Sequence, residues 1–261
     1  MHAEYFETTL PSATGPLPRL QILRLFGMGV HLARGLATAA LVFPFASPAA
    51  RVGFARSWAR GMIRALGAQL RIEGAAPAPG SLLVANHVSW LDILAIASCT
   101  PAIFVAKSEV RDWPAIGWLA ARAQALFLKR SSGRSLLRVK NRIAALLTER
   151  SSIAIFPEGT TSDGSSVLPF RSGLLQAAVD GRRPVQPVAI AYYGDDGNRS
   201  LDAAFVDGMS LWQSLVAICR SGRITMRLAF AAPLVPAGRT RKELAREARD
   251  TITTSVTRGL K

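Results

Sequence analysis

Apolar and polar positions along the chain follow two patterns. Short, mostly apolar runs predict strands. Longer segments with helical spacing predict helices, one of them marked by Pro and Gly between residues 107 and 124. The expected strands cover 69–73, 81–85, 103–106, 125–128, 153–156, 185–191 and 224–230, and the other helices cover 50–66, about 90–98, 134–149 and the end of the chain from about 240. Strands that alternate with helices predict an α/β domain with a mixed, mostly parallel sheet flanked by helices.

The N-terminal part of the chain has a different pattern. Residues 1–18 are polar and Pro-rich, so they do not form a cleavable signal sequence. Residues 20–46 are apolar but carry charges, and the longest uncharged run, 35–50, would reach only about 24 Å as a helix, against a hydrocarbon core of about 30 Å. We therefore expect helices that lie in the membrane interface rather than one that spans it, with a buried core helix as the alternative. These patterns divide the chain into membrane-associated residues 1–66 and a domain over 67–261.

The charge of the chain narrows the choice of partners. Its 32 Lys and Arg against 17 Asp and Glu give a net charge of +15, which predicts attraction to nucleic acid, an anionic membrane surface or an acidic carrier protein. Few aromatic residues accompany the basic stretches and no binding module is recognisable, so nucleic acid is the poorest of these partners. Three histidines and two unpaired cysteines argue against a metal site. Arginines four residues apart predict two basic stripes, Arg56–Arg60–Arg64 and Arg134–Arg138–Arg142.

The first candidate for chemistry is the pair His87 and Asp92, which follows an expected buried strand. On one continuous helix, residues five apart do not face each other, whereas a strand that turns into a helix lets Asp92 reach back toward His87. A neutral imidazole there takes a proton from an attacking hydroxyl, and the carboxylate fixes its tautomer. The alternative is a capping box in which Ser89 and Asp92 start the helix, and both roles can coexist.

A second group of candidates lies in loops. Pro157-Glu158-Gly159 follows a buried strand and leads into small and hydroxyl residues whose backbone N–H groups can approach an anion, although an ordinary turn fits the same residues. Lys107, Arg130 and Arg171 stand near strand ends. Such cations bind phosphate or carboxylate, with solvated surface charge as the alternative.

Together these segments resemble the 1-acylglycerol-3-phosphate acyltransferase family of phospholipid synthesis, over roughly residues 70–191. Four blocks occur in the family's order: 86–92 with His87 and Asp92; Lys107, Pro114, Gly117 and 127–130; 156–160; and 185–188. The resemblance implies transfer of a fatty acyl group from acyl carrier protein or coenzyme A, as co-substrate, to a lysolipid hydroxyl at the cytoplasmic face of a membrane. It implies no metal, no cofactor and no covalent acyl-enzyme.

The resemblance also implies residue roles. His87 is the general base and Asp92 its partner. Glu158, Gly159, Thr160 and Arg130 shape or bind the acceptor site, and Lys107 and Arg171 are further candidates for it.

Two positions depart from the family pattern. Thr161 stands where the family often has an arginine suited to phosphate, and Gln124 stands where a glycine is usual. The run 158–164 also looks like the branch that acylates lyso-ornithine lipid. Two other classes of function stay open at this stage: a non-catalytic peripheral lipid-binding protein, and a thioester hydrolase that uses the same base on water.

Overall fold

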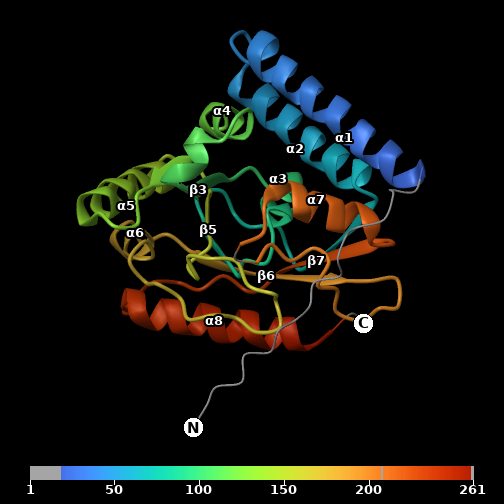
Figure 1. The fold of residues 1–261 in the computed structure, drawn as a ribbon. Coiled ribbons are helices and arrows are strands. Elements are labelled where there is room, and N and C mark those ends of the chain that lie inside the picture. Colours follow the sequence, from blue (N-terminus) through green and yellow to red (C-terminus); the bar gives the residue numbers. More distant parts are fainter. Residues whose placement is uncertain (1–18, 207, 260–261) are drawn as a thin grey trace.

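The structure is a computed structural model that describes residues 19–206 and 208–259. A seven-stranded sheet lies between two layers of helices (Figure 1). Its strands are β1 (Ala68–Glu73), β2 (Leu82–Ala85), β3 (Ile103–Lys107), β4 (Leu126–Leu128), β5 (Ile153–Ile155), β6 (Val185–Tyr193) and β7 (Ile224–Phe230), in the spatial order β1-β7-β6-β2-β5-β3-β4.

The direction of the strands decides where a site can form. Every neighbouring pair is parallel except β6 and β7, which are antiparallel. Five adjacent strands, from β6 to β4, therefore run the same way and end at one edge of the sheet. The expected mixed, mostly parallel α/β fold is confirmed, and this shared carboxyl edge is where ligands bind in such folds.

The central strand β2 shows how the two helical layers arise. All four of its side chains are buried, which explains its continuous apolar run. Leu83 and Ala85 pack with one set of helices, whereas Leu82 and Val84 pack with the other. The first set contains α2 (Pro48–Ala65), α3 (Leu91–Cys99) and α7 (Leu211–Arg220), and the second contains α5 (Gly133–Thr148), α6 (Gln176–Asp180) and α8 (Arg241–Thr257). The short helix α4 (Ile116–Arg122) and the 3-10 turn 108–112 connect β3 to β4.

The N-terminal segment forms a helical hairpin. Helix α1 (Arg19–Ala37) continues into a π-helical turn at 38–42, and α2 returns beside it (Figure 1). His31 Nε2 donates to the carbonyl of Trp58 at 2.9 Å, and Trp58 Nε1 donates to the carbonyl of His31 at 3.1 Å. Gly35 lies against the Trp58 ring and Gly61 against the His31 ring, so side chains at either glycine would separate the two helices.

Two of the three arginines of the expected basic stripe on α2 also bind the sheet domain. Arg56 and Arg60 donate to the carbonyls of Cys99 and Ser98 at 2.9 Å each. These carbonyls lie at the carboxyl end of α3, where a helix has unpaired acceptors and a negative dipole end. Both arginines therefore attach the hairpin to the sheet domain, whereas Arg64 is an exposed cation as the stripe predicted.

Helix α7 was not among the expected elements. Ser210 and Gln213 form a full capping box at its start. That Ser-x-x-Gln pattern before an apolar run is a readable start signal for a helix. Arg24 of α1 donates to carbonyls at the other end of α7, so the two helices are joined.

Candidate active site

The corner between β2 and α3 brings His87 and Asp92 together. β2 ends at Ala85 and α3 begins at Leu91, so the two residues are not on one helix. His87 Nδ1 lies 2.8 Å from Asp92 Oδ2. The expected strand-to-helix corner is therefore present, and it fixes Nδ1 as the nitrogen that faces the carboxylate.

Asp92 is completely buried and fully hydrogen-bonded. Its Oδ2 also accepts from the backbone N–H groups of Val88 at 2.8 Å and Ser89 at 3.0 Å. The bond from Ser89 N–H is the one that the acidic residue of a capping box makes, but the Ser89 hydroxyl accepts from the N–H of Leu91 at 3.4 Å, so only the Asp92 half of the expected box is present. The other oxygen, Oδ1, accepts from the hydroxyl of Tyr192.

Tyr192 is a site residue that the sequence analysis missed. It lies near the end of β6, 100 residues from Asp92, and is buried. Burial and the neighbouring carboxylate raise the pKa of its hydroxyl well above the usual value, so it stays a proton donor to Asp92. Asn86 holds this arrangement together, because its side chain makes two hydrogen bonds to the backbone of Ile190 on β6.

Glu158 supports His87 through the backbone. The residue is 5% exposed, and its Oε1 accepts from the N–H of His87 at 2.8 Å. Its Oε2 accepts from the N–H of Leu168 at 3.2 Å. Burial raises the pKa of the Glu158 carboxyl to about 7 and outweighs the two backbone hydrogen bonds, which favour the ionised form. We expected Glu158 to bind or shape the acceptor site, and its carboxyl group accepts from the backbone N–H of His87.

The His87 ring is held from one face. Phe156 stacks on it, with ring centroids 4.0 Å apart and planes at 16°. With Nδ1 directed at Asp92, the second ring nitrogen, Nε2, has no protein partner within the described part of the chain. The His87 side chain is 19% exposed, so the ring is not sealed from solvent.

Three of the expected cations line one cavity. Lys107 at the end of β3, Arg130 after β4 and Arg171 border a space of about 220 Å³, and Gly159 and Phe156 lie in the same wall. Burial and the charge of Arg171 lower the pKa of Arg130. The cavity thus gathers positive charge beside the ring that stacks on His87, which suits an anionic ligand group.

The loop after Glu158 closes over this corner. Gly159 has φ +77°, and a Cβ there would lie 3.2 Å from Arg171 Nε. Ser162 donates its N–H to the carbonyl of His87 at 2.9 Å, and the Thr161 hydroxyl donates to the carbonyl of Phe205. Thr160 is half-buried in this loop but is not among the residues that line the cavity.

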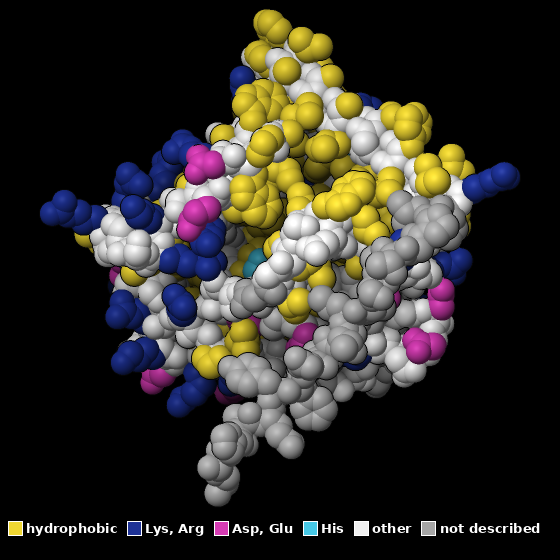
Figure 2. Space-filling view, in the orientation of Figure 1, with side chains coloured by type: hydrophobic (Ala, Val, Ile, Leu, Met, Phe, Trp, Pro, Cys, Tyr) yellow, Lys and Arg dark blue, Asp and Glu magenta, His cyan; other side chains and the backbone are white. Residues whose placement is uncertain are grey.

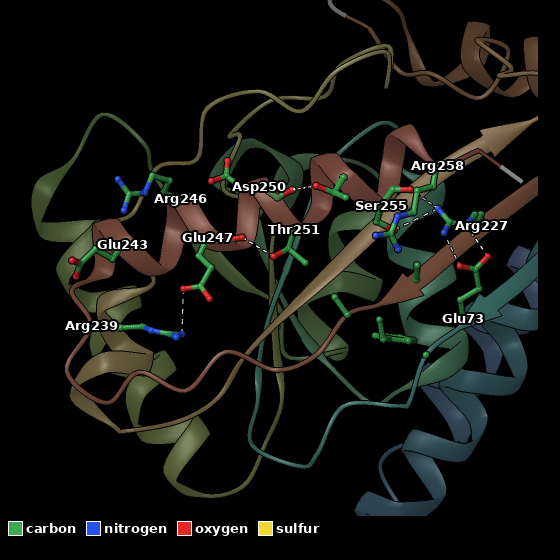
Figure 3. A pocket seen from close by; sticks show the side chains of 15 residues that line it. Glu73, Arg227, Arg239, Glu243, Arg246, Glu247, Asp250, Thr251, Ser255 and Arg258 are labelled. Carbon is green, nitrogen blue, oxygen red and sulfur yellow. Dashed lines mark hydrogen bonds and ion pairs between the residues drawn. The ribbon is translucent and has the colours of Figure 1, made fainter.

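A larger hollow of about 890 Å³ lies elsewhere, between α8 and the strands β1 and β7 (Figure 3). Two ion pairs lie in its wall, Arg227 with Glu73 at 2.6 Å and Arg239 with Glu247 at 3.2 Å. It contains none of the expected site residues. The expected cations and Gly159 instead line the smaller cavity at the carboxyl edge.

The geometry supports base catalysis on a hydroxyl. A buried carboxylate orients a partly exposed imidazole, and Phe156, which stacks on that imidazole, also lines the cavity that holds the three cations. Among residues 19–206 and 208–259, no three His, Cys, Asp or Glu side chains are grouped so as to hold a metal ion.

Comparisons with known proteins agree with this geometry. A family model described as Acyltransferase matches residues 69–191. The chain is 39% identical over 197 residues to a lyso-ornithine lipid O-acyltransferase of Pseudomonas aeruginosa, covering 76% of each chain. It is 35% identical to a 1-acyl-sn-glycerol-3-phosphate acyltransferase of Neisseria meningitidis, covering 66% of this chain and 68% of that one. The fold matches the crystal structure of a 1-acyl-sn-glycerophosphate (LPA) acyltransferase from Thermotoga maritima with a TM-score of 0.68 at 22% identity, covering 91% and 93% of the two chains.

Proposed function

Because the chain belongs to the acyltransferase family, whose members transfer acyl groups in lipid biosynthesis, we propose that it moves a fatty acyl group from a carrier thioester to the hydroxyl of a lysolipid. The donor is acyl carrier protein or coenzyme A. The observation that carries the proposal is the His87–Asp92 contact at the carboxyl edge of the sheet, beside a cavity with three cations.

The proposed reaction needs one base and no covalent acyl-enzyme. His87 Nε2 removes the proton of the lysolipid hydroxyl while its oxygen attacks the thioester carbonyl carbon. Asp92 stabilises the imidazolium that forms. The tetrahedral intermediate then collapses, the carbon–sulfur bond breaks, and the thiolate takes the proton back from His87. The products are an ester and a free thiol.

The three-cation cavity supports an acceptor with an anionic head group. Lys107, Arg130 and Arg171 suit the phosphate of 1-acylglycerol 3-phosphate. A second acceptor, lyso-ornithine lipid, is favoured by position 161, where Thr161 is hydrogen-bonded to a neighbouring loop and supplies no cation. The ornithine head group carries a carboxylate that the same cations can bind.

We also propose that the α1–α2 hairpin lies in the interface of an anionic membrane, on its cytoplasmic side. Apolar side chains on α1 and at the hairpin tip are widely exposed, for example Phe26 at 70% and Phe45 at 90% (Figure 2). Residues 19–42 are long and apolar enough to span a bilayer by length and composition alone. However, α2 packs along α1 and carries Arg51, Arg56, Arg60 and Arg64, which disfavours the hydrocarbon core for the pair.

The test is a transfer assay with purified protein in lipid vesicles. Lysophosphatidic acid and lyso-ornithine lipid are offered separately, each with both thioester donors. We expect acylated lipid from at least one combination, and His87→Ala to reduce its rate by at least about 10³-fold while the folded structure is kept. Free fatty acid without acylated lipid would instead indicate a hydrolase, and vesicle binding without turnover of any thioester would indicate a lipid-binding protein.

A further inference from the structure

We propose that the exposed face of α5 docks an acidic acyl carrier protein and delivers its thioester to the cavity beside His87. The inference rests on the proposed function, and it assigns the donor's binding surface. Arg134, Arg138 and Arg142 project from α5 at intervals of four residues, opposite its buried Val139, Ile143 and Leu147. They therefore form one row on the solvent side of an amphipathic helix.

The row of arginines is largely unneutralised. Arg142 lies 3.9 Å from Glu149, but Arg134 and Arg138 have no acidic partner within the described part of the chain. Leu137 is 56% exposed between them. Three cations spaced over eight residues extend about 12 Å along the helix, which matches two turns of an acidic helix on a partner. An exposed leucine among arginines offers such a partner an apolar anchor.

The position of α5 favours a soluble partner over the bilayer. α5 packs on the face of β2 that carries Leu82 and Val84, whereas the α1–α2 hairpin packs on the opposite face. Figure 2 shows Lys and Arg side chains gathered on the side of the molecule where α5 lies, apart from the apolar side chains of the hairpin. A membrane that covers the hairpin therefore leaves the arginine row of α5 open to a protein in solution.

The N-terminal end of α5 borders the cavity that contains Arg130 and Lys107. Ser132, Gly133 and Leu136, at the start of α5, line the same cavity as Arg130 and Lys107. A carrier protein holds its acyl group on a flexible phosphopantetheine arm, which can enter the cavity from this end of α5. Phe156 lines the cavity and stacks on His87, so a thioester carried inward along this wall approaches the base.

The decisive experiment compares two donors in one variant. R134E/R138E reverses two charges on exposed positions, and it leaves the cations of the cavity unchanged. The donors are palmitoyl-acyl carrier protein and palmitoyl-pantetheine, which has no protein and no charge. We expect kcat/KM with the carrier protein to fall at least about tenfold and kcat/KM with palmitoyl-pantetheine to stay within about twofold. The matched control, R241E/K242E on α8, reverses two exposed charges away from the cavity and should affect neither donor.

Each other outcome overturns the docking site. An equal loss with both donors would mean that the arginine row binds the acceptor lipid or the membrane, and weaker vesicle binding by R134E/R138E would identify the membrane. No loss with the carrier protein would remove α5 from donor binding. Failure of the underlying function is separate, because the unaltered protein would then transfer no acyl group from either donor.

Discussion

Asp92 is the residue on which most of the site depends. One of its oxygens accepts from His87 Nδ1 and from the N–H groups of Val88 and Ser89, and the other accepts from Tyr192. The carboxylate therefore orients the base and starts α3 at the same time. An amide can still accept the backbone hydrogen bonds, whereas only a carboxylate stabilises the imidazolium.

The substitution Asp92→Asn separates these two functions. We expect the transfer rate to fall on the order of 10³ to 10⁴-fold, because the imidazolium formed at His87 loses its counter-charge. The free energy of unfolding should change by only about 1 kcal/mol, because the oxygen of asparagine still caps the helix. Rate assays and urea unfolding on the same sample measure both. Retained activity with a large loss of stability would reduce Asp92 to a helix cap.

Tyr192 is expected to position Asp92 without touching the substrate. Tyr192→Phe leaves a buried carboxylate oxygen without its donor, so we expect a loss of about 1 to 3 kcal/mol in the free energy of unfolding. Without that donor the carboxylate is held less firmly against the imidazole. We therefore expect kcat to fall with KM little changed. An unchanged kcat beside the loss of stability would leave Tyr192 a purely structural role.

How much of the site the sequence could predict depended on separation along the chain. His87 and Asp92 are five residues apart, and a buried run before a turn is enough to suggest that they meet. Glu158 reaches the His87 backbone across 71 residues, and Tyr192 reaches Asp92 across 100. Those contacts depend on β5 and β6 lying on the two sides of β2, and local patterns of residues carry no information about that order.

At the scale of elements, the central strands were predictable because they are short apolar runs between turns. Strand β2 is buried on both faces and β5 likewise, so their runs are continuous. The roles of charged residues on helices were less predictable. Arg56 and Arg60 have helical spacing typical of a solvated stripe, but they bind the end of α3, which only the tertiary packing determines.

The hairpin yields a prediction about membrane binding. Phe45 at its tip is 90% exposed and contributes little to folding. Phe45→Asp removes a side chain whose burial in lipid is worth about 2 kcal/mol and adds a charge, so we expect vesicle partitioning to fall at least about tenfold. Val235→Asp, at another exposed apolar position outside the hairpin, is the control. Sedimentation with anionic vesicles compares them, and equal binding by both variants would place the membrane contact elsewhere.

The end of α4 yields a prediction about stability. Gln124 follows the helix with φ +62°, and the N–H of Ala125 bonds back to the carbonyl of Ala120, as in a glycine-terminated helix. A side chain in this left-handed conformation is strained. We expect Gln124→Gly to raise the free energy of unfolding by about 0.5 to 1 kcal/mol, and Gln124→Ala not to raise it. Urea unfolding measures the difference, and a loss with glycine would mean that the side chain itself stabilises the turn.

At the scale of the whole molecule, the two substrates are expected to arrive from different sides. The hairpin packs on one face of the sheet and α5 on the other, so in the proposed arrangement the hairpin meets the bilayer with the lysolipid and α5 meets the soluble donor. The carboxyl edge between these faces holds His87. The sheet thus lies between the two proposed binding surfaces, and both substrates would reach His87 at its carboxyl edge.

The free energy of unfolding should depend on pH through the carboxyl group of Glu158. Burial raises the pKa of this carboxyl from its ordinary 4.5 to about 7 in the folded chain, so the folded state binds the proton more tightly than the unfolded state. The free energy of unfolding therefore falls as pH rises from about 4.5 to about 7, by an amount of the order of 3 kcal/mol from this group. The substitution Glu158→Gln removes this contribution to the pH dependence, because an amide does not titrate in this range.

Urea unfolding of both proteins at pH 5 and pH 8 tests this. The unaltered chain should lose more stability between the two pH values than the Glu158→Gln variant does. The variant should also be about 1 kcal/mol less stable at pH 5, since one backbone N–H loses its acceptor. Parallel pH profiles for the two proteins would show that Glu158 is not the group responsible.

The long separations across the central strand have a consequence for refolding. His87 gains its backbone partner only when β5 pairs with β2, and Asp92 gains Tyr192 only when β6 does. Such distant pairings form slowly compared with local helices. Recovery of acyl transfer after dilution from denaturant should consequently lag behind recovery of the helical circular dichroism signal. The rate at which activity returns would then report how fast the central strands pair.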